Sequence, residues 1–229
     1  MDFGRALTYA FDDRQWTEKL IVAAIMVFLS AIPLLGLVAL AGLLGWVVEL
    51  IQNMQDGRSN PMPRWDNIGD KIALGGSVLI AILVYSIPNL LLACCAFSIP
   101  AIAQGGRSEF FAGSFAVGLV CCLVPLLLIY NVITWPMLAI GTVRYSEVRQ
   151  TGVFYQFGDL FSAVTEKSGL VIQWLFYSCI ASLLLGLINV IPCIGWLVSL
   201  ALTFPIQGHL LGQFARALQD KPKGKPKRA

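Results

Sequence analysis

The sequence predicts an all-α protein, a polytopic membrane helix bundle with about six transmembrane helices in three hairpins, each preceded by a short interfacial helix. Three observations support this. The 229 residues are 57% hydrophobic and only 13% charged, so they carry more apolar surface than a soluble domain of this size can bury. The apolar residues gather in long stretches. The basic residues lie between these stretches in an alternating pattern.

Proline and glycine clusters divide the apolar stretches into helices near 14–31, 35–54, 72–99, 111–143, 168–190 and 196–216. The fourth is long for one crossing and contains Pro125 and Pro136, so a kink or a break is expected there. The first helix, about 18 residues, extends roughly 27 Å, which barely spans a hydrocarbon core of about 30 Å. A first hairpin that crosses fully and one that dips in and returns therefore both stay open.

The distribution of charge predicts the orientation. Of the 16 Lys and Arg residues, only Arg107, between the third and fourth helices, falls on one side of this arrangement. The positive-inside rule therefore predicts a multi-pass protein of the bacterial cytoplasmic (inner) membrane with both termini in the cytoplasm. The basic residues assigned to the cytoplasmic side are Arg5, Arg14, Lys19, Arg58, Arg64, Lys71, Arg144, Arg149, Lys167, Arg216, Lys221, Lys223, Lys225, Lys227 and Arg228.

The chain also shows internal similarity. Two tight connections share the pattern Ile-Pro-x-x-Gly, at 32–36 and 191–195, where Pro ends one helix and Gly permits the turn. A second pattern, at 2–7, 67–72 and 156–161, places bulky apolar residues four positions apart before each proposed hairpin. We therefore predict one transmembrane domain, 1–218, with repeats at 1–54, 66–145 and 155–216, and a disordered basic cytoplasmic tail, 219–229.

The segment 56–67 is the most distinctive polar stretch. It contains Gly57, Pro61, Pro63 and Trp65-Asp66, leads into Ile-Gly-Asp, and follows an Ile-Pro-x-x-Gly hairpin. With the early Asp-Asp-x-x-Trp element at 12–16, this pattern resembles an uncharacterised prokaryotic membrane-protein family, domain of unknown function four thousand and thirteen. That family tends to have an acidic residue where this chain has Arg64. The resemblance implies a multi-helix membrane protein and brings no activity with it.

No nucleotide-binding loop, hydrolase elbow or zinc-protease motif occurs, and no catalytic residue, metal or cofactor is predicted. Polar residues inside apolar helices are the candidates for ligand binding. Glu49 either serves such a site or pairs with a basic residue such as Arg144, and the amides either line a cavity or join helices by hydrogen bonds. The ligand-binding candidates are Glu49, Asn89, Asn131, Thr134, Gln173, Asn189, Gln207 and His209; the predicted interface anchors are Trp16, Arg64 and Trp65.

The main functional hypothesis is a non-enzymatic membrane module, either for binding or transport of a ligand or lipid, or for assembly of a complex. Transport predicts a polar cavity lined by Asn131, Thr134, Asn189 and Gln173. The alternative is an intramembrane enzyme that uses Glu49 or His209. The expected partners are the lipid bilayer, anionic lipids at the tail, and a membrane-protein partner or a second copy of the chain. Nucleic acid is not expected, because no folded basic face accompanies the tail.

Overall fold

The computed structural model describes residues 1–104, 109–192 and 194–219, and describes side chains for all of these except 95–120 and 122. Every regular element in these residues is helical. Only Gln219 of the predicted tail is described, and it ends the last helix; Arg107 also lies outside the described residues. The elements are α1 (Phe3–Thr8), η1 (Tyr9–Asp12), α2 (Trp16–Leu29), α3 (Leu35–Gln55), α4 (Ile68–Gln104), α5 (Glu109–Val148), η2 (Thr151–Tyr155), α6 (Phe157–Glu166), α7 (Ser168–Ile188) and α8 (Gly195–Gln219).

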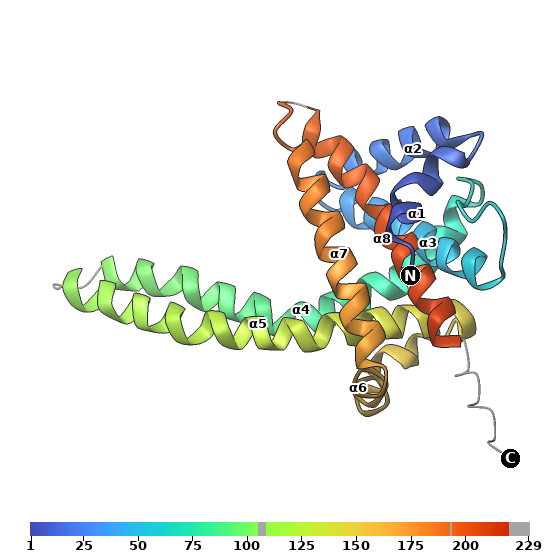
Figure 1. Ribbon diagram of the computed structural model, residues 1–229. Coiled ribbons are helices and arrows are strands. Elements are labelled where there is room, and N and C mark those ends of the chain that lie inside the picture. Colours follow the sequence, from blue (N-terminus) through green and yellow to red (C-terminus); the bar gives the residue numbers. More distant parts are fainter. Residues whose placement is uncertain (105–108, 193, 220–229) are drawn as a thin grey trace, which may run out of the picture.

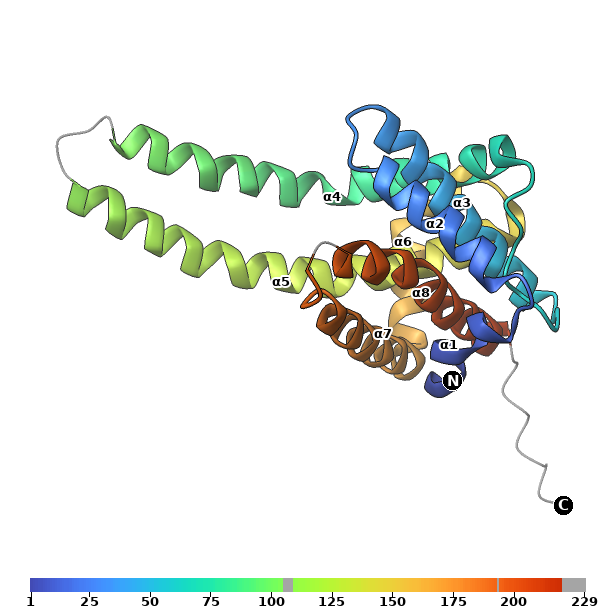
Figure 2. The ribbon, with the colours of Figure 1, turned by 90° about the horizontal axis from the view of Figure 1, so that it is seen from above.

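Helices that follow each other in the chain contact each other, α2 with α3, α3 with α4, α4 with α5, and α7 with α8, and α3 also packs against α8. α4 and α5 run side by side and extend well beyond the rest of the molecule (Figure 1, Figure 2). α7 runs in a clearly different direction from this pair (Figure 1). α3 lies at the centre of the body and contacts α2, α4, α5 and α8. α5 continues through Pro125 and Pro136, so the expected break does not occur.

Four described segments are long and apolar enough to cross a membrane, which fits an integral membrane protein: Leu35–Gln55, Ile68–Cys94, Leu123–Val148 and Ser168–Ile188. The prediction of six such helices is therefore confirmed only for four. α2 has 14 residues, which extend only about 21 Å. α8 is long enough, but Gln207, His209 and Gln213 make it more polar.

Two of the three predicted short helices form as separate elements. α1 precedes the first hairpin and α6 the third, but the segment 67–72 runs directly into α4. On α6, Phe157 and Phe161 are about half exposed, as expected at a membrane interface. On α1, Phe3 instead packs against Tyr177 of α7, with ring centroids 5.5 Å apart.

Both Ile-Pro-x-x-Gly connections adopt the same turn. The glycine N–H donates to the isoleucine carbonyl in each, Gly36 to Ile32 at 2.7 Å and Gly195 to Ile191 at 3.0 Å. The residue before each glycine donates to the proline carbonyl, at 2.8 Å in both turns. A Cβ on either glycine would overlap a carbonyl oxygen at the end of the preceding helix. The motif therefore encodes one turn twice; the larger repeats stay a prediction.

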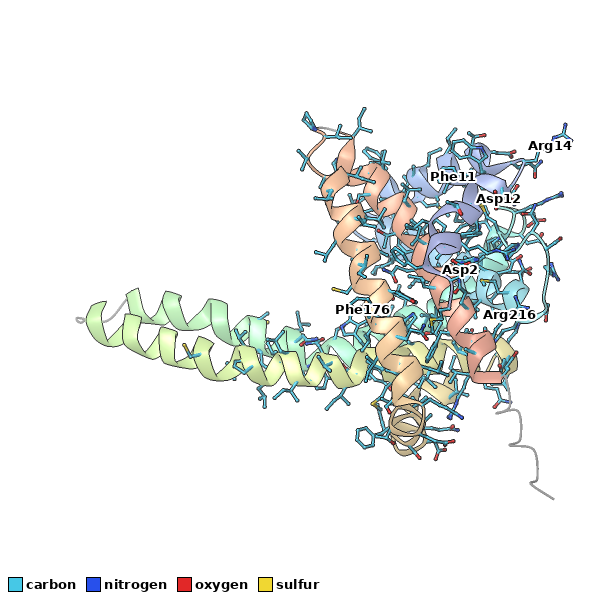
Figure 3. All side chains as sticks on the ribbon, in the orientation of Figure 1. Asp2, Phe11, Asp12, Arg14, Phe176 and Arg216 are labelled. Carbon is cyan, nitrogen blue, oxygen red and sulfur yellow. The ribbon has the colours of Figure 1, made fainter. Side chains whose placement is uncertain are left out.

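Glycines also set the closest helix contacts. α3 and α4 cross at Gly45 and Gly75, where an added Cβ would overlap the Lys71 or Ala41 carbonyl oxygen of the facing helix. α8 approaches α3 through Gly208 and Gly212, a small-x-x-x-small pair. These contacts fix α3 against its neighbours and bring its carboxyl-terminal half to the charged end of the body. Asp2, Asp12, Arg14 and Arg216 lie at this end, opposite the tip of the α4–α5 pair (Figure 3).

Candidate functional site

Glu49 of α3 forms an ion pair with Lys71 in the first turn of α4. The Lys71 Nζ lies 2.5 Å from a Glu49 carboxylate oxygen and 3.7 Å from Asp66. The Lys71 side chain is only 4% exposed and that of Glu49 is 30% exposed. The close crossing at Gly45 brings the two residues together. The partner of Glu49 is therefore Lys71, a residue that the sequence placed in a connecting segment, and not Arg144.

The proline-containing segment 56–67 folds back onto the ends of α2 and α3. Three consecutive carbonyl oxygens, those of 61–63, each accept a hydrogen bond from a side chain. Asn53 donates to Pro61 at 2.9 Å, Lys19 to Met62 at 2.7 Å and Trp46 to Pro63 at 3.1 Å. Side chains from α2 and α3 therefore hold this segment in place.

The predicted interface anchors differ in their surroundings. Trp65 stacks on Trp46, with ring centroids 5.5 Å apart and the planes 1° from parallel, and its indole N–H donates to the Lys19 carbonyl at 2.9 Å. Trp65 therefore holds α2 to the 56–67 segment. Trp16 is partly exposed and makes an edge contact with Phe11, and Arg64 is exposed.

Lys19 is buried beside the carboxylate of Asp13, with an N–O distance of 2.5 Å. Burial alone would raise the pKa of the Asp13 carboxyl. The hydrogen bonds from Lys19 and from the backbone N–H of Gln15 outweigh it, so this pKa lies below its ordinary value. Lys19 thus joins the loop after η1, through Asp13, to the 56–67 segment, through Met62.

A polar cavity of about 690 Å³ opens between these groups. It contains charges of both signs, so it favours no single class of charged ligand by sign alone. Glu49 faces this cavity. Its lining residues are Asp13, Arg14, Gln15, Lys19, Glu49, Asn53, Arg58, Asn60, Met62, Pro63, Arg64 and Asp66.

His209 is buried at the contact between α8 and the N-terminal segment. Its ring stacks on Tyr9, with centroids 4.0 Å apart, and its Nδ1 lies 3.2 Å from Gln213 Nε2. The Tyr9 hydroxyl donates to the Pro205 carbonyl at 2.9 Å. Burial, with a smaller contribution from Asp13, raises the pKa of Tyr9 well above its ordinary value, so this hydroxyl stays protonated.

His209 lines a second pocket, of about 230 Å³, which shares Arg58 and Asn60 of the 56–67 segment with the first. Three arginines and two aspartates line this pocket. The arginines come from α1, the 56–67 segment and α8. The complete lining is Asp2, Arg5, Tyr9, Asp12, Met54, Arg58, Ser59, Asn60, Pro61, His209, Gln213 and Arg216.

The amides in α4 and α5 bond to each other. Asn89 and Asn131 exchange two hydrogen bonds, of 3.1 and 3.0 Å, and Asn131 also donates to the Leu127 carbonyl. Thr134 donates to the carbonyl four residues before it. These three residues line a cavity of only about 40 Å³. Their arrangement joins the two helices and leaves little room for a solute.

The remaining candidates lie elsewhere. Gln207 of α8 donates to the Ser178 carbonyl and to the Ser182 hydroxyl of α7, at 3.1 and 3.2 Å. Asn189 is exposed at the end of α7, and Gln173 is partly exposed on the same helix. Neither lines the cavity at Asn131 and Thr134, so the four residues expected along a transport path are not brought together.

A third cavity, of about 580 Å³, lies between α3, α4, α5, α7 and α8, and its lining is mostly apolar. Among the polar atoms of the lining, two are buried without a hydrogen-bond partner in the described residues, the Trp174 Nε1 and the Ser178 Oγ. These residues, four apart on one face of α7, were not among the sequence candidates, because a tryptophan and a serine in an apolar helix are ordinary packing residues. The other lining residues include Val78, Trp135, Leu138, Phe204, Gln207 and Gly208.

Comparison with known proteins adds a family. The family described as "Protein of unknown function (DUF4013)" matches residues 20–202, a range that includes both Ile-Pro-x-x-Gly turns and the proline-containing segment. This confirms the resemblance drawn from the 56–67 pattern, although the Asp-Asp-x-x-Trp element lies outside the matched range. No curated protein and no solved structure matches the chain.

Proposed function

The chain belongs to the DUF4013 family, whose description states no activity, and from its geometry we propose that it is an integral protein of the bacterial cytoplasmic membrane that binds a lipid-like molecule between its helices. The observation that carries this proposal is the cavity of about 580 Å³ with two unpaired polar atoms in a mostly apolar wall.

The lining of the cavity specifies the chemistry of its occupant. The volume falls within the range of ligand sites, roughly 300–1,000 Å³, and the apolar wall suits a hydrocarbon chain. A buried N–H or O–H without a partner costs about 1–3 kcal/mol, so an occupant with oxygen acceptors would be favoured over a pure hydrocarbon. Trp174 lies six residues, about 9 Å, into α7. At that depth the ester oxygens of a membrane lipid are the nearest abundant acceptors.

The arrangement in the membrane follows from the charges. We propose that all three hairpins enter the bilayer from the cytoplasmic face, because the described basic residues lie at the bases of the hairpins and none lies in the turns 30–34 or 189–194. Both termini then lie in the cytoplasm. With α2 only 14 residues long, the first hairpin either crosses a thinned bilayer or returns before crossing.

The topology is testable by labelling single cysteines with a membrane-impermeant maleimide in an otherwise cysteine-free chain. Cysteines at Arg58 and Arg149 should label only from the cytoplasmic side. Leu34, 83% exposed in the first turn, should label from outside only if this hairpin crosses fully. Labelling of Arg58 and Arg149 from opposite sides would contradict the proposed orientation.

Lipid occupancy is testable by fluorescence quenching. Trp16, Trp135 and Trp196 are replaced by Phe, and two proteins that keep Trp46 and Trp65 are compared, one with Trp174 and one with Trp174→Phe. Because Trp174 is only 8% exposed, bulk lipid has little contact with it, whereas a chain inside the cavity contacts it directly. Phospholipids with brominated chains should quench the Trp174 protein more strongly. Equal quenching of the two proteins would refute a lipid-filled cavity. If a second copy of the chain shields Trp174 from the brominated lipid, an assembly role is indicated instead.

An enzyme is the second candidate, favoured by one observation: Glu49 and His209 each line a polar pocket at the charged end. Glu49 is held by Lys71 and His209 by Gln213, so each has a defined orientation. Replacement of each by Gln, scored by complementation of a deletion strain against the amount of folded protein, separates the two roles. A fully folded variant without function would support catalysis.

A further inference from the structure

The pocket at His209 combines three arginines that lack carboxylate partners. Arg5 comes from α1, Arg58 from the 56–67 segment and Arg216 from the last turns of α8. None of the three forms an ion pair within 4.0 Å of a carboxylate among the described residues, although Asp2 and Asp12 line the same pocket. Asp2 and Arg216, which both line this pocket, are labelled at the charged end in Figure 3. Converging guanidinium groups repel one another unless an anion lies between them.

Hydrogen bonding gives the buried histidine a free donor beside these arginines. The Gln213 Oε1 accepts from the backbone N–H of Asp2 at 2.6 Å, which assigns the Gln213 Nε2 as the donor toward His209 Nδ1. The neutral ring then carries its proton on Nε2. This atom makes no hydrogen bond to any described residue, and His209, which is only 3% exposed, lines the pocket.

From these two observations we propose that this pocket binds a phosphate group. Arginine is the side chain best matched to phosphate, because its planar fork makes two parallel charge-assisted hydrogen bonds. The Nε2–H of His209 adds a neutral donor from the pocket wall. The volume of about 230 Å³ suits a phosphate with a small substituent and is below the usual range for larger ligands. The phosphate belongs either to a lipid headgroup or to a free phosphorylated solute.

The pocket is separate from the apolar cavity, and no residue lines both. This proposal therefore does not depend on lipid occupancy at Trp174, and either can fail alone.

The test is a thermal-unfolding titration of the purified full chain in a neutral maltoside detergent at constant ionic strength. Three additions are compared: inorganic phosphate, dioleoylphosphatidylglycerol, and dioleoylglycerol, which has the same chains without phosphate. The variant is Arg5→Gln with Arg216→Gln. Both side chains are exposed and make no hydrogen bond to described residues, so the fold should persist. The matched control is Arg14→Gln with Arg64→Gln, two exposed arginines that line the neighbouring cavity.

We expect saturable stabilisation of the wild type and of the control, and at least a tenfold loss of affinity in the variant. Stabilisation by inorganic phosphate identifies a free solute as sufficient. Stabilisation by phosphatidylglycerol, without an effect of phosphate or dioleoylglycerol, identifies a lipid headgroup. The proposal is overturned if neither phosphate compound stabilises the wild type, if the variant binds as tightly as the wild type, or if the control loses as much affinity.

Discussion

Ser178→Ala gives the sharpest test of the apolar cavity, because it removes one unpaired hydroxyl and little else. The Ser178 Oγ is buried at the cavity wall without a partner among the described residues. An unpaired buried hydroxyl costs about 1–3 kcal/mol, and alanine is a better helix former than serine. In the empty protein, the variant should therefore be more stable by about 1 kcal/mol, which raises Tm by about 2–4 °C for a chain of this size.

The effect on binding has the opposite sign. A ligand with an oxygen acceptor pairs with the hydroxyl and recovers this penalty, so removing the hydroxyl removes that gain. A difference of about 1 kcal/mol corresponds to an affinity about fivefold lower. The assay is a titration with a phospholipid, followed by tryptophan fluorescence in detergent. A hydrocarbon of the same chain length, which has no acceptor, is the control ligand and should bind both proteins equally.

Two results would refute this reasoning. If the variant binds phospholipid as tightly as the wild type, the hydroxyl does not contact the ligand. If the Tm of the empty variant falls, the hydroxyl has a partner in the protein, and the premise of an unpaired group is wrong.

Further predictions concern the charged end and the helix crossing. Gly75→Ala should destabilise the fold by about 1–3 kcal/mol or more, since its Cβ would overlap the backbone of α3. Gly76→Ala, with nothing within 4 Å of the added Cβ, should instead stabilise α4 by up to about 1 kcal/mol. Denaturation in mild detergent measures both changes. Glu49→Gln should lower the free energy of unfolding by roughly 3 kcal/mol, because Lys71 stays buried without its closest partner. Adding Lys71→Met should recover most of this loss. A much smaller loss in Glu49→Gln would show that Asp66, 3.7 Å from Lys71, compensates for Glu49. Because the folded pKa of Asp13 lies below its ordinary value, its contribution to stability is present above about pH 4 and is lost as the pH falls through the folded pKa. Tm should therefore fall less steeply on acidification in Asp13→Asn, and parallel profiles would contradict the assignment.

The all-helical fold and two of its turns could be predicted because their signals are local. The Ile-Pro-x-x-Gly turns occur where they were expected, with the same hydrogen bonds in each. Apolar runs located the six long helices to within several residues at most ends. The number of helices that cross a membrane is harder to predict, because it also depends on where each helix ends. α2 ends at Leu29, before the apolar run does, because the residues before Pro33 form the turn and do not extend the helix.

The polar contacts were harder to predict, because they depend on which helices touch. Glu49 was a clear candidate in the sequence, but its partner Lys71 is determined by the glycine crossing of α3 and α4. Asn89 and Asn131 were both named, yet nothing in the sequence pairs them. Trp174 and Ser178 gave no signal, since only the three-dimensional structure shows that their polar atoms lack partners.

The residues on which the family resemblance was drawn have mainly structural roles in this chain. The Pro61 and Pro63 carbonyls accept hydrogen bonds from α3, and Trp65 stacks on Trp46 and bonds to α2. This pattern therefore describes residues that hold the 56–67 segment against α2 and α3. It is no evidence for a shared chemistry. It follows that the function of this chain is better sought where side chains lack partners among the described residues: at Trp174 and Ser178 in the apolar cavity, and at the arginines around His209. Variants at these positions should change ligand binding without unfolding the protein, whereas variants of Trp46, Asn53 or Trp65, which hold the proline-containing segment, should lower stability.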